Sequence, residues 1–230
     1  MHVPVREPYD WDRVLAWLDP RSIPDLESVE DGVYRRGDLT VARADGGLDV
    51  SGTADPVALA RVFDTAHDPA QLTDPLFARA PGIRVPGTWS GWELAVRAVL
   101  GQQVSVAGAR RTAHKLIELH GDGFPPPEAL VDGALPGMPA SRARALRALA
   151  EAVAGGLVLD PPLDRARTRA QLLALPGFGP WTVEYIAMRA LRDPDAWPGT
   201  DLHLRRVASA ADAERWRPWR AYAAMVLWQT

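Results

Sequence analysis

Apolar residues recur at helical spacing through most of the chain beyond residue 86. The clearest case follows a glycine-containing turn at residues 175–180, where Pro180 suits the first turn of a helix. One face of that helix is rich in aromatic side chains and carries Trp181, Tyr185, Met188 and Leu191. The same spacing predicts helices over residues 89–100, 106–120, 140–154 and 202–210, the last with Leu204 and Val207 directed inward.

The first 85 residues have a different pattern. Apolar and polar residues alternate within short runs, and turn residues separate these runs. Three runs, at residues 33–36, 39–43 and 48–52, predict antiparallel strands joined by tight turns. Helices are predicted on either side, over residues 12–18 and 56–63. A stretch with Pro and Gly at residues 84–88 is the expected boundary. The chain should therefore be mainly α-helical, with an N-terminal α+β part at residues 1–85 and a helical region at residues 86–230.

The composition indicates a globular protein without cysteine-dependent chemistry. A chain of 230 residues that is 47% hydrophobic is long enough to bury a core. The absence of cysteine excludes disulfides, thiolate zinc sites and iron–sulfur clusters. The five histidines show no metal-binding spacing, so no catalytic metal is predicted. Without a leader segment or a membrane-spanning run, we expect a soluble protein in the cytoplasm.

Charge is distributed unevenly between the two regions. The formal net charge is −3, but residues 1–85 hold 9 basic and 15 acidic side chains, while residues 86–230 hold 17 basic and 14 acidic ones. Positive charge therefore gathers in the helical region, where it would suit a polyanionic partner. One concentration comprises Arg97, Arg110, Arg111 and Lys115, and we expect most such side chains on solvated helix faces.

The turn at residues 175–180 has the composition of a loop that binds phosphate through its backbone. Gly177 and Gly179 can take positive φ and bring the backbone close to a ligand. The N–H groups that open the next helix, including that of Thr182, have no partner within the helix. Together these groups form a concavity that suits a phosphate oxygen. The pattern predicts a nucleic-acid contact that needs no lysine cluster.

Asp201 follows a second break in the chain, the bend at residues 198–200, and precedes a predicted helix. Aspartate is a preferred residue at a helix N-terminus, because its carboxylate accepts hydrogen bonds from free backbone N–H groups. A carboxylate at the mouth of a helix is also placed to act in catalysis. The position alone leaves both interpretations open, and capping is the commoner role.

Taken together, these motifs resemble the helix-hairpin-helix family of base-excision DNA glycosylases. The resemblance rests on the glycine hairpin, the helix that carries Trp181 and Tyr185, and the aspartate that follows. It narrows to the AlkA-type branch, the 3-methyladenine DNA glycosylases II, through motifs at residues 9–11, 100–105, 178–185 and 215–222. It covers nearly the whole chain. The fold it implies is a small antiparallel sheet domain followed by helical lobes with the active-site cleft between them.

The resemblance also implies roles for individual residues. Asp201 would drive cleavage of the N-glycosidic bond. Gln103 lies where the family inserts an apolar wedge into DNA, and a simple helix-joining loop is an equal alternative there. Backbone carbonyls of Leu173, Leu175 and Gly177 would hold a monovalent cation, and no other cofactor is required. The base pocket would be lined by Trp181, Tyr185, Trp228 and Trp17, the last of which is also typical of plain core.

Residues near Asp201 indicate the kind of reaction. Trp181 lies where bifunctional members of the superfamily carry a Schiff-base lysine, so we expect a monofunctional enzyme that leaves an abasic site. Glu184 is expected to be solvated, so no second catalytic carboxylate is predicted. His203 is expected to face a phosphate or solvent. The leaving base should then be activated already, as in cationic 3-methyladenine or 7-methylguanine. Aromatic faces would attract such a cation.

Two further interpretations stay open. The chain could be a non-catalytic helix-hairpin-helix module that binds DNA, with Asp201 only as a cap. It could also be a glycosylase for neutral bases such as hypoxanthine or uracil. In the preferred interpretation the partner is double-stranded DNA with alkylated bases, and the protein acts as a monomer in the bacterial cytoplasm, associated with the nucleoid.

Overall fold

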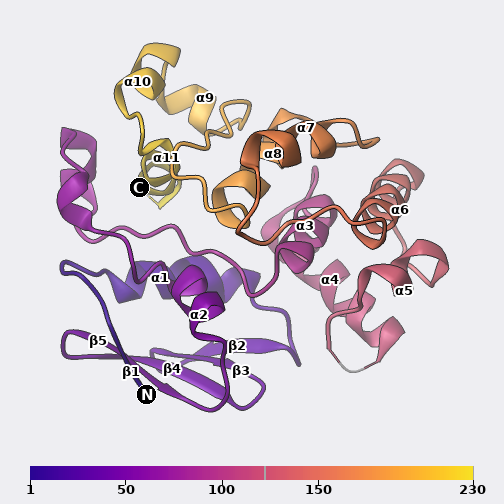
Figure 1. Ribbon diagram of the computed structural model, residues 1–230, viewed down its shortest axis with the longest axis horizontal. Helices are drawn as coiled ribbons and strands as arrows, with labels where there is room; N and C mark the ends of the chain where they lie inside the picture. Colours follow the sequence, from indigo (N-terminus) through magenta and orange to yellow (C-terminus); the bar gives the residue numbers. More distant parts are fainter. Residues whose placement is uncertain (122, 230) are drawn as a thin grey trace.

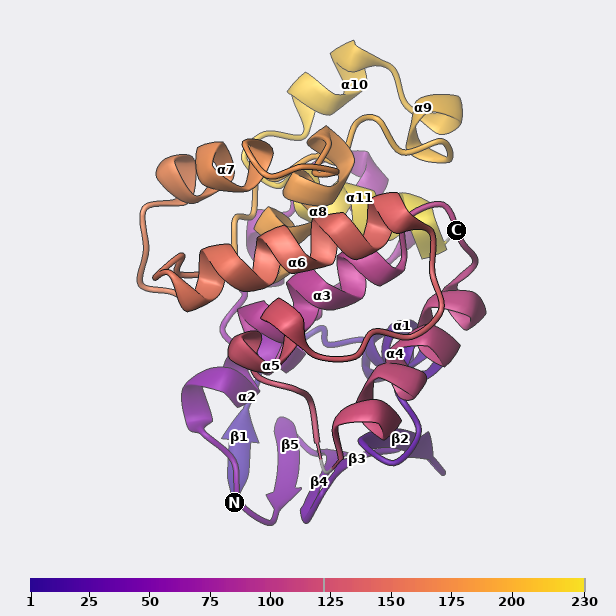
Figure 2. The same cartoon turned by 90° about the vertical axis from the view of Figure 1, so that its right-hand side faces the viewer.

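The structure is a computed structural model that describes residues 1–121 and 123–229. A five-stranded antiparallel sheet lies at one end of the molecule, and the short helices α9 (Leu204–Val207) and α10 (Ala210–Arg215) lie at the other (Figure 1 and Figure 2). Longer helices fill the space between them. The fold is mainly α-helical with an N-terminal α+β part, which confirms the predicted class.

The sheet has the strand order β1-β5-β4-β3-β2 and is antiparallel throughout. Strands β3 (Val33–Arg36), β4 (Leu39–Ala44) and β5 (Gly47–Ser51) match the three predicted runs to within one residue at each end. The edge strands β1 (His2–Pro4) and β2 (Glu27–Glu30) are not indicated by the sequence pattern. Both are short and carry little apolar alternation.

Helices α1 (Trp11–Leu18) and α2 (Pro56–Phe63) cover one face of the sheet. Alternate strand residues direct apolar side chains toward them, as the burial pattern of β4 shows. The ring of Phe63 contacts those of Trp11 and Tyr34, with centroids 5.6 and 5.4 Å apart. This packing brings the C-terminal end of α1 against the helical region.

The helical region is built around α3, in which every residue except Arg97 is buried. This helix contacts α4, α6 and α8. Besides α9 and α10, the α-helices of the region are α3 (Gly91–Leu100), α4 (Val106–His120), α5 (Pro127–Asp132), α6 (Ala140–Ala154), α7 (Arg165–Leu173), α8 (Pro180–Arg189) and α11 (Arg220–Gln229). Within the described ranges, no helix has the length and apolar character needed to cross a membrane.

The boundary at residues 85–86 stays a prediction, because buried side chains from both sides of it form one continuous hydrophobic core. Trp11, Trp92 and Trp216 belong to this core. Trp89 and Trp219 pack against it and remain partly exposed.

Helix α3 begins at Gly91 and not at residue 89 as predicted. The backbone before it is bound to other segments, since the Trp89 carbonyl accepts a hydrogen bond from Arg61 and the Gly91 N–H donates to Asp160. These contacts hold the residues before Gly91 outside the helix.

The single helix predicted over residues 202–210 is two helices, α9 and α10. The chain becomes extended after α9, and Ser209 then opens α10 through a reciprocal capping box with Asp212. The predicted inward direction of Val207 is wrong, because this side chain is 48% exposed.

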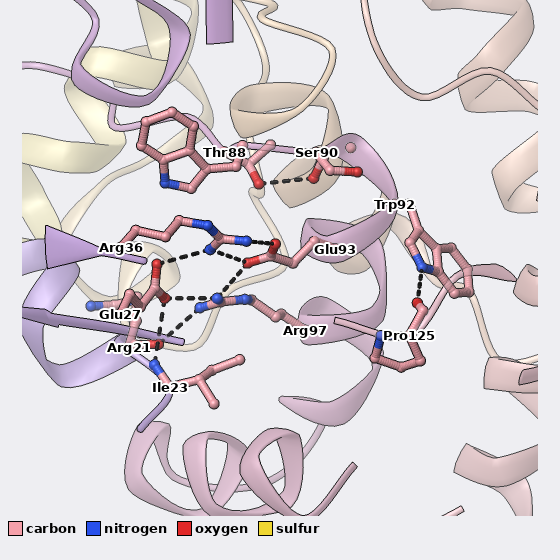
Figure 3. Close-up of polar contacts among 12 residues, drawn as sticks. Arg21, Ile23, Glu27, Arg36, Thr88, Ser90, Trp92, Glu93, Arg97 and Pro125 are labelled. Carbon is pink, nitrogen blue, oxygen red and sulfur yellow. Dashed lines mark hydrogen bonds and ion pairs between the residues drawn. The ribbon is translucent and has the colours of Figure 1, made fainter. Parts of the chain in front are cut away.

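Four charged side chains join the sheet to α3 in a network with little exposure to solvent (Figure 3). Arg36 and Arg97 each contact both Glu27 and Glu93, at N···O distances between 2.5 and 3.2 Å. Tyr34 donates its hydroxyl to Glu27 at 2.6 Å. Burial alone raises the pKa of Glu27, but Arg97 and the Tyr34 hydrogen bond outweigh burial and hold the pKa below its ordinary value. The expectation of a solvated helix face is therefore wrong for Arg97.

Removing one charge from this network should destabilise the fold. Glu27→Gln leaves two arginines with one carboxylate, and we expect the free energy of unfolding to fall by about 3 kcal/mol at neutral pH. Because the folded-state pKa of Glu27 is lowered, its contribution is present above the ordinary pKa of 4.5 and is lost as the pH falls through the lower folded value.

Urea unfolding of both proteins across the acid range checks this expectation. The difference between wild type and Glu27→Gln should shrink as the pH falls below about 4.5. Glu30→Gln, on the same strand but exposed, is the control and should change stability little. A difference that persists unchanged at acid pH would contradict the assignment.

Candidate active site

Residues 175–180 form a tight hairpin between α7 and α8, as the glycine pattern predicts. Gly177 has a φ of 82°, and a Cβ added there would lie 2.8 Å from the Cβ of Ala145. Glycine is therefore needed at this position. The expectation of positive φ is wrong for Gly179, whose φ is −99° and whose added Cβ would meet open space. Gly177 fixes the turn, and Gly179 leaves its backbone accessible.

Gln102, a residue without a predicted role, ties this hairpin to the loop after α3. Its side-chain amide donates to the Gly177 carbonyl at 3.0 Å and to the Thr182 hydroxyl at 3.1 Å. Thr182 is buried, so its side chain faces Gln102 and not solvent. Gln103, the next residue, is exposed at the loop tip with a φ of 58°. The predicted wedge position thus projects from a loop that is anchored on the hairpin.

Asp201 lies beside two indole rings at the end of the bend. Its carboxylate accepts hydrogen bonds from Trp181 Nε1 at 3.0 Å and from Trp228 Nε1 at 3.3 Å. It also accepts the backbone N–H groups of His203 and Leu204, at 2.9 and 3.1 Å. The carboxylate therefore caps the turn that leads into α9 and faces the aromatic residues at the same time.

The four predicted aromatic side chains line a cavity next to this carboxylate, together with Tyr34 and Trp89. Trp181 stacks on Tyr185 with ring centroids 5.2 Å apart, and Trp17 stacks on Trp228 at 5.6 Å. Tyr185 and Trp228 lie 6.4 Å apart, which joins the two pairs. The cavity has a volume of about 360 Å³, within the range of small-ligand pockets, and Asp201 forms part of its wall. The structure thus brings the predicted pocket residues and the predicted catalytic residue together.

Two arginines without a predicted role also line the cavity. The Arg21 guanidinium lies 3.5 Å from the ring centroid of Trp17, and Arg189 donates to the Tyr185 hydroxyl at 2.7 Å. Burial alone raises the pKa of Tyr185, but the charges of Arg189 and Arg21 outweigh burial and lower it. The rings of Trp17 and Tyr185 were expected to attract a cationic base. Each ring already lies beside an arginine of the protein.

The sequence contains a weak signal for this arrangement. Trp17 precedes Arg21, and Tyr185 precedes Arg189, by four positions, the spacing that places two side chains on one helix face. An arginine at that distance from a pocket aromatic residue is a candidate for the same pocket.

Glu184 and His203 have structural contacts. The expectation of a solvated Glu184 is wrong, because it pairs with Arg169 at 2.8 Å and accepts the Trp197 N–H at 3.0 Å. His203 is exposed, as expected, but its Nε2 also lies 2.9 Å from the carbonyl oxygen of Leu227. Both side chains join segments that are distant in the sequence.

The carbonyls implied as cation ligands belong to the end of α7 and to the hairpin. The Leu175 carbonyl accepts the Phe178 N–H at 3.2 Å, and that of Gly177 accepts from Gln102. Each carbonyl oxygen has a second lone pair. In the described part of the chain, no cluster of histidine or acidic side chains could hold a metal ion. Neutral oxygen donors without a carboxylate fit a monovalent cation.

Comparisons with known proteins place this chain in a family. Residues 1–68 match the AlkA N-terminal domain. A probable bifunctional transcriptional activator/DNA repair enzyme AlkA of Mycobacterium tuberculosis is 36% identical, over 100% of this chain and 56% of the relative. DNA-3-methyladenine glycosylase 2 of Escherichia coli is 34% identical, over 97% of this chain and 94% of the relative.

The fold has a solved counterpart in a 3-methyladenine DNA glycosylase from Archaeoglobus fulgidus. The TM-score is 0.81 at 19% identity, over 99% of this chain and 96% of that structure. The chain therefore belongs to the AlkA family of DNA glycosylases, as its motifs indicate. It spans about half the length of the M. tuberculosis relatives.

The two hairpin glycines should respond differently to an added methyl group. Gly177→Ala places a side chain at positive φ and against Ala145, so the free energy of unfolding should fall by about 2 kcal/mol. Gly179→Ala has an ordinary φ and open space, so its change should stay within about 0.5 kcal/mol. Chemical denaturation of both variants measures the contrast, and equal losses would contradict it.

Proposed function

We propose that this protein is a monofunctional DNA glycosylase that excises N-alkylated purines such as 3-methyladenine from double-stranded DNA and leaves an abasic site. The carboxylate of Asp201 carries the proposal, because it lies on the wall of an aromatic cavity and is held by Trp181 and Trp228. The name of the E. coli relative supports the same activity. The protein would act as a monomer on the DNA of a bacterial cell.

Asp201 is suited to stabilise positive charge on the sugar. Breaking the bond between a base and C1′ gives the deoxyribose oxocarbenium character, and the electron pair leaves with the base. The Oδ1 atom of Asp201 accepts three hydrogen bonds, whereas Oδ2 accepts only that of Trp181 among the described residues. Oδ2 therefore has lone-pair capacity left for the sugar or for an attacking water. A cationic purine leaves as a neutral base and needs no general acid.

The lack of an amine at the cavity supports hydrolysis without strand cleavage. Trp181 occupies the first turn of α8, next to Asp201. The single lysine of the chain, Lys115, is exposed on α4 and does not line the cavity. A Schiff base with the sugar requires an amine within reach. Water would be the nucleophile instead.

DNA would be held by backbone groups and opened by the loop after α3. The accessible backbone at Gly179 and the first turn of α8 suit a phosphate oxygen. Gln103 would enter the duplex and fill the space of the extruded base, where its amide could pair with the orphaned partner base. Val104, which is 41% exposed, adds apolar surface beside it.

The interpretation as a non-catalytic DNA-binding module fits the cavity less well. An aspartate that only caps a helix needs the backbone N–H groups of His203 and Leu204, but no indole donors and no adjoining cavity. A preference for neutral bases is favoured by one specific observation, the positive charge of Arg21 and Arg189 at the cavity.

Replacing the carboxylate should separate catalysis from folding. Asp201→Asn keeps an oxygen that can accept the backbone N–H groups of His203 and Leu204 and loses only the acceptor for the Trp181 N–H, so the helix cap and the overall fold should be kept. We expect release of 7-methylguanine from a methylated duplex to fall about a hundredfold or more, while binding of the duplex is preserved. Asp45→Asn, in an exposed turn of the sheet, is the matched control. Undiminished base release by Asp201→Asn would refute the proposed catalytic role.

We also propose that carbonyls of Leu173, Leu175 and Gly177 hold a monovalent cation that attracts a DNA phosphate to the hairpin. Replacing K⁺ and Na⁺ by tetramethylammonium at constant ionic strength should weaken duplex binding several-fold, because the larger ion cannot approach the carbonyl oxygens. Fluorescence anisotropy with a labelled duplex measures the affinity. Equal affinity in the two salts would contradict a role for the cation.

A further inference from the structure

The last turn of α11 is joined to the turn that carries Asp201 by the side chain of His203. The Nε2 atom of His203 lies 2.9 Å from the carbonyl oxygen of Leu227. A carbonyl oxygen can only accept a hydrogen bond, so Nε2 carries the hydrogen and donates it. That carbonyl belongs to the peptide unit between Leu227 and Trp228. His203 therefore holds the backbone of Trp228, one of the aromatic residues of the cavity.

The Leu227 carbonyl needs a donor from outside its own helix. It lies in the last turn of α11, which ends at Gln229, and the carbonyls of a last helical turn have no partner within the helix. A histidine side chain can satisfy such a carbonyl. Here the histidine lies 24 positions earlier in the chain. The bond thus caps the helix and also ties it to a distant segment of the site.

Three contacts connect His203, Trp228 and Asp201 in a closed arrangement. The His203 backbone N–H donates to Oδ1 of Asp201 at 2.9 Å, and the Trp228 indole N–H donates to the same oxygen at 3.3 Å. The His203 side chain completes the arrangement through the peptide unit of Trp228. The indole bond is longer than the usual range of roughly 2.7 to 3.2 Å, so it restrains Trp228 only weakly by itself.

The other contacts of this turn leave the direction of the indole N–H free. The Trp228 ring stacks on Trp17, with centroids 5.6 Å apart. Stacking restrains the tilt of a ring but allows it to slide, whereas a hydrogen bond requires its N–H to point at the acceptor. Arg13 donates to the Gln229 carbonyl at 3.4 Å, which is a long contact. The bond from His203 is the shortest that fixes the backbone beside Trp228.

We propose that His203 is a positioning residue that keeps the Trp228 indole on Oδ1 of Asp201 and thereby directs Oδ2 at the reacting sugar. This inference rests on the proposed function of Asp201. While Oδ1 accepts Trp228 and the backbone donors, the carboxylate has one orientation, and Oδ2 keeps lone-pair capacity for C1′ or water. If the indole moves away, the carboxylate can rotate, and Oδ2 faces the sugar for less of the time.

His203→Ala removes the side-chain donor and keeps the backbone N–H that Asp201 accepts. We expect single-turnover release of 7-methylguanine at saturating enzyme to fall about fivefold, while the affinity for the methylated duplex is unchanged. His203→Gln carries an amide nitrogen that can donate to the same carbonyl. This variant should restore the rate to within about twofold of the wild type.

His120 offers a matched control. Its Nε2 atom lies 2.8 Å from the carbonyl oxygen of Ala134, and the residue does not line the cavity. His120→Ala therefore removes the same type of hydrogen bond at a distance from Asp201. Both alanine variants should lose a similar, small amount of stability in chemical denaturation, but only His203→Ala should lose base release. Equal losses of rate would make His203 a general structural contact and overturn the proposal.

An exposed histidine that contacted DNA would give a different result. Weaker duplex binding by His203→Ala, with an unchanged rate at saturation, would assign the side chain to a phosphate and overturn its positioning role. A double-mutant cycle adds a second criterion. Trp228→Phe removes the indole N–H, so His203→Ala should lower the rate much less in that background than in the wild type. Fully additive losses would contradict an action through Trp228.

Failure of the proposed function can be distinguished from failure of this inference. If the wild type releases no 7-methylguanine, the glycosylase assignment fails, and NMR then tests the three contacts alone. The Trp228 indole N–H signal is assigned by its loss in Trp228→Phe. Its exchange with solvent should be several-fold faster in His203→Ala and unchanged in His120→Ala. Unchanged exchange in His203→Ala overturns the role of His203 in holding Trp228.

Discussion

The hydrogen bonds to the Asp201 carboxylate organise the site. Donors reach it from α8 through Trp181, from α11 through Trp228 and from the backbone that leads into α9. Each bond is charge-assisted and is therefore stronger than a bond between neutral groups. Three segments that are far apart in the chain converge on two oxygen atoms. Capping and the proposed catalysis would thus depend on the same carboxylate, and the sequence alone could not separate the two roles.

The N-terminal α+β part is an integral portion of the site. It supplies Trp17 and Arg21 to the cavity, and the network of Glu27 and Tyr34 with Glu93 and Arg97 lines the same cavity. The sheet is attached to α3 by ionic contacts with little exposure, which leaves few ways for it to shift. The shape of the cavity therefore depends on both regions of the chain.

Local sequence patterns were sufficient to predict much of the fold. Helical periodicity located α4 and α6, turn residues located the three inner strands, and motif spacing placed Trp181, Tyr185 and Asp201 together. These features depend on residues close in the sequence or on a family pattern. Each can be recognised without knowledge of the other segments.

The same patterns could not predict contacts between segments that are distant in the sequence. Arg97 has the sequence appearance of a surface arginine, yet it closes an ion network with a glutamate 70 positions away. Arg189 and Gln102 are similar, since each donates to at least one backbone carbonyl, and any residue supplies a carbonyl. The edge strand β1 is three residues long and depends on β5 for its existence. Sequence periodicity carries no record of such pairings.

The contacts of Gln102 have a mechanical consequence for the way DNA would be recognised. One amide links the loop tip to the hairpin, and Arg142 of α6 donates to the Gln102 carbonyl at 2.5 Å. The two parts that would touch DNA, the tip at Gln103 and the turn at Gly179, are therefore a fixed distance apart. Because their separation is fixed, they would fit only a DNA strand that is bent to the same spacing. Distortion of the double helix would then be tested before any base reached the pocket.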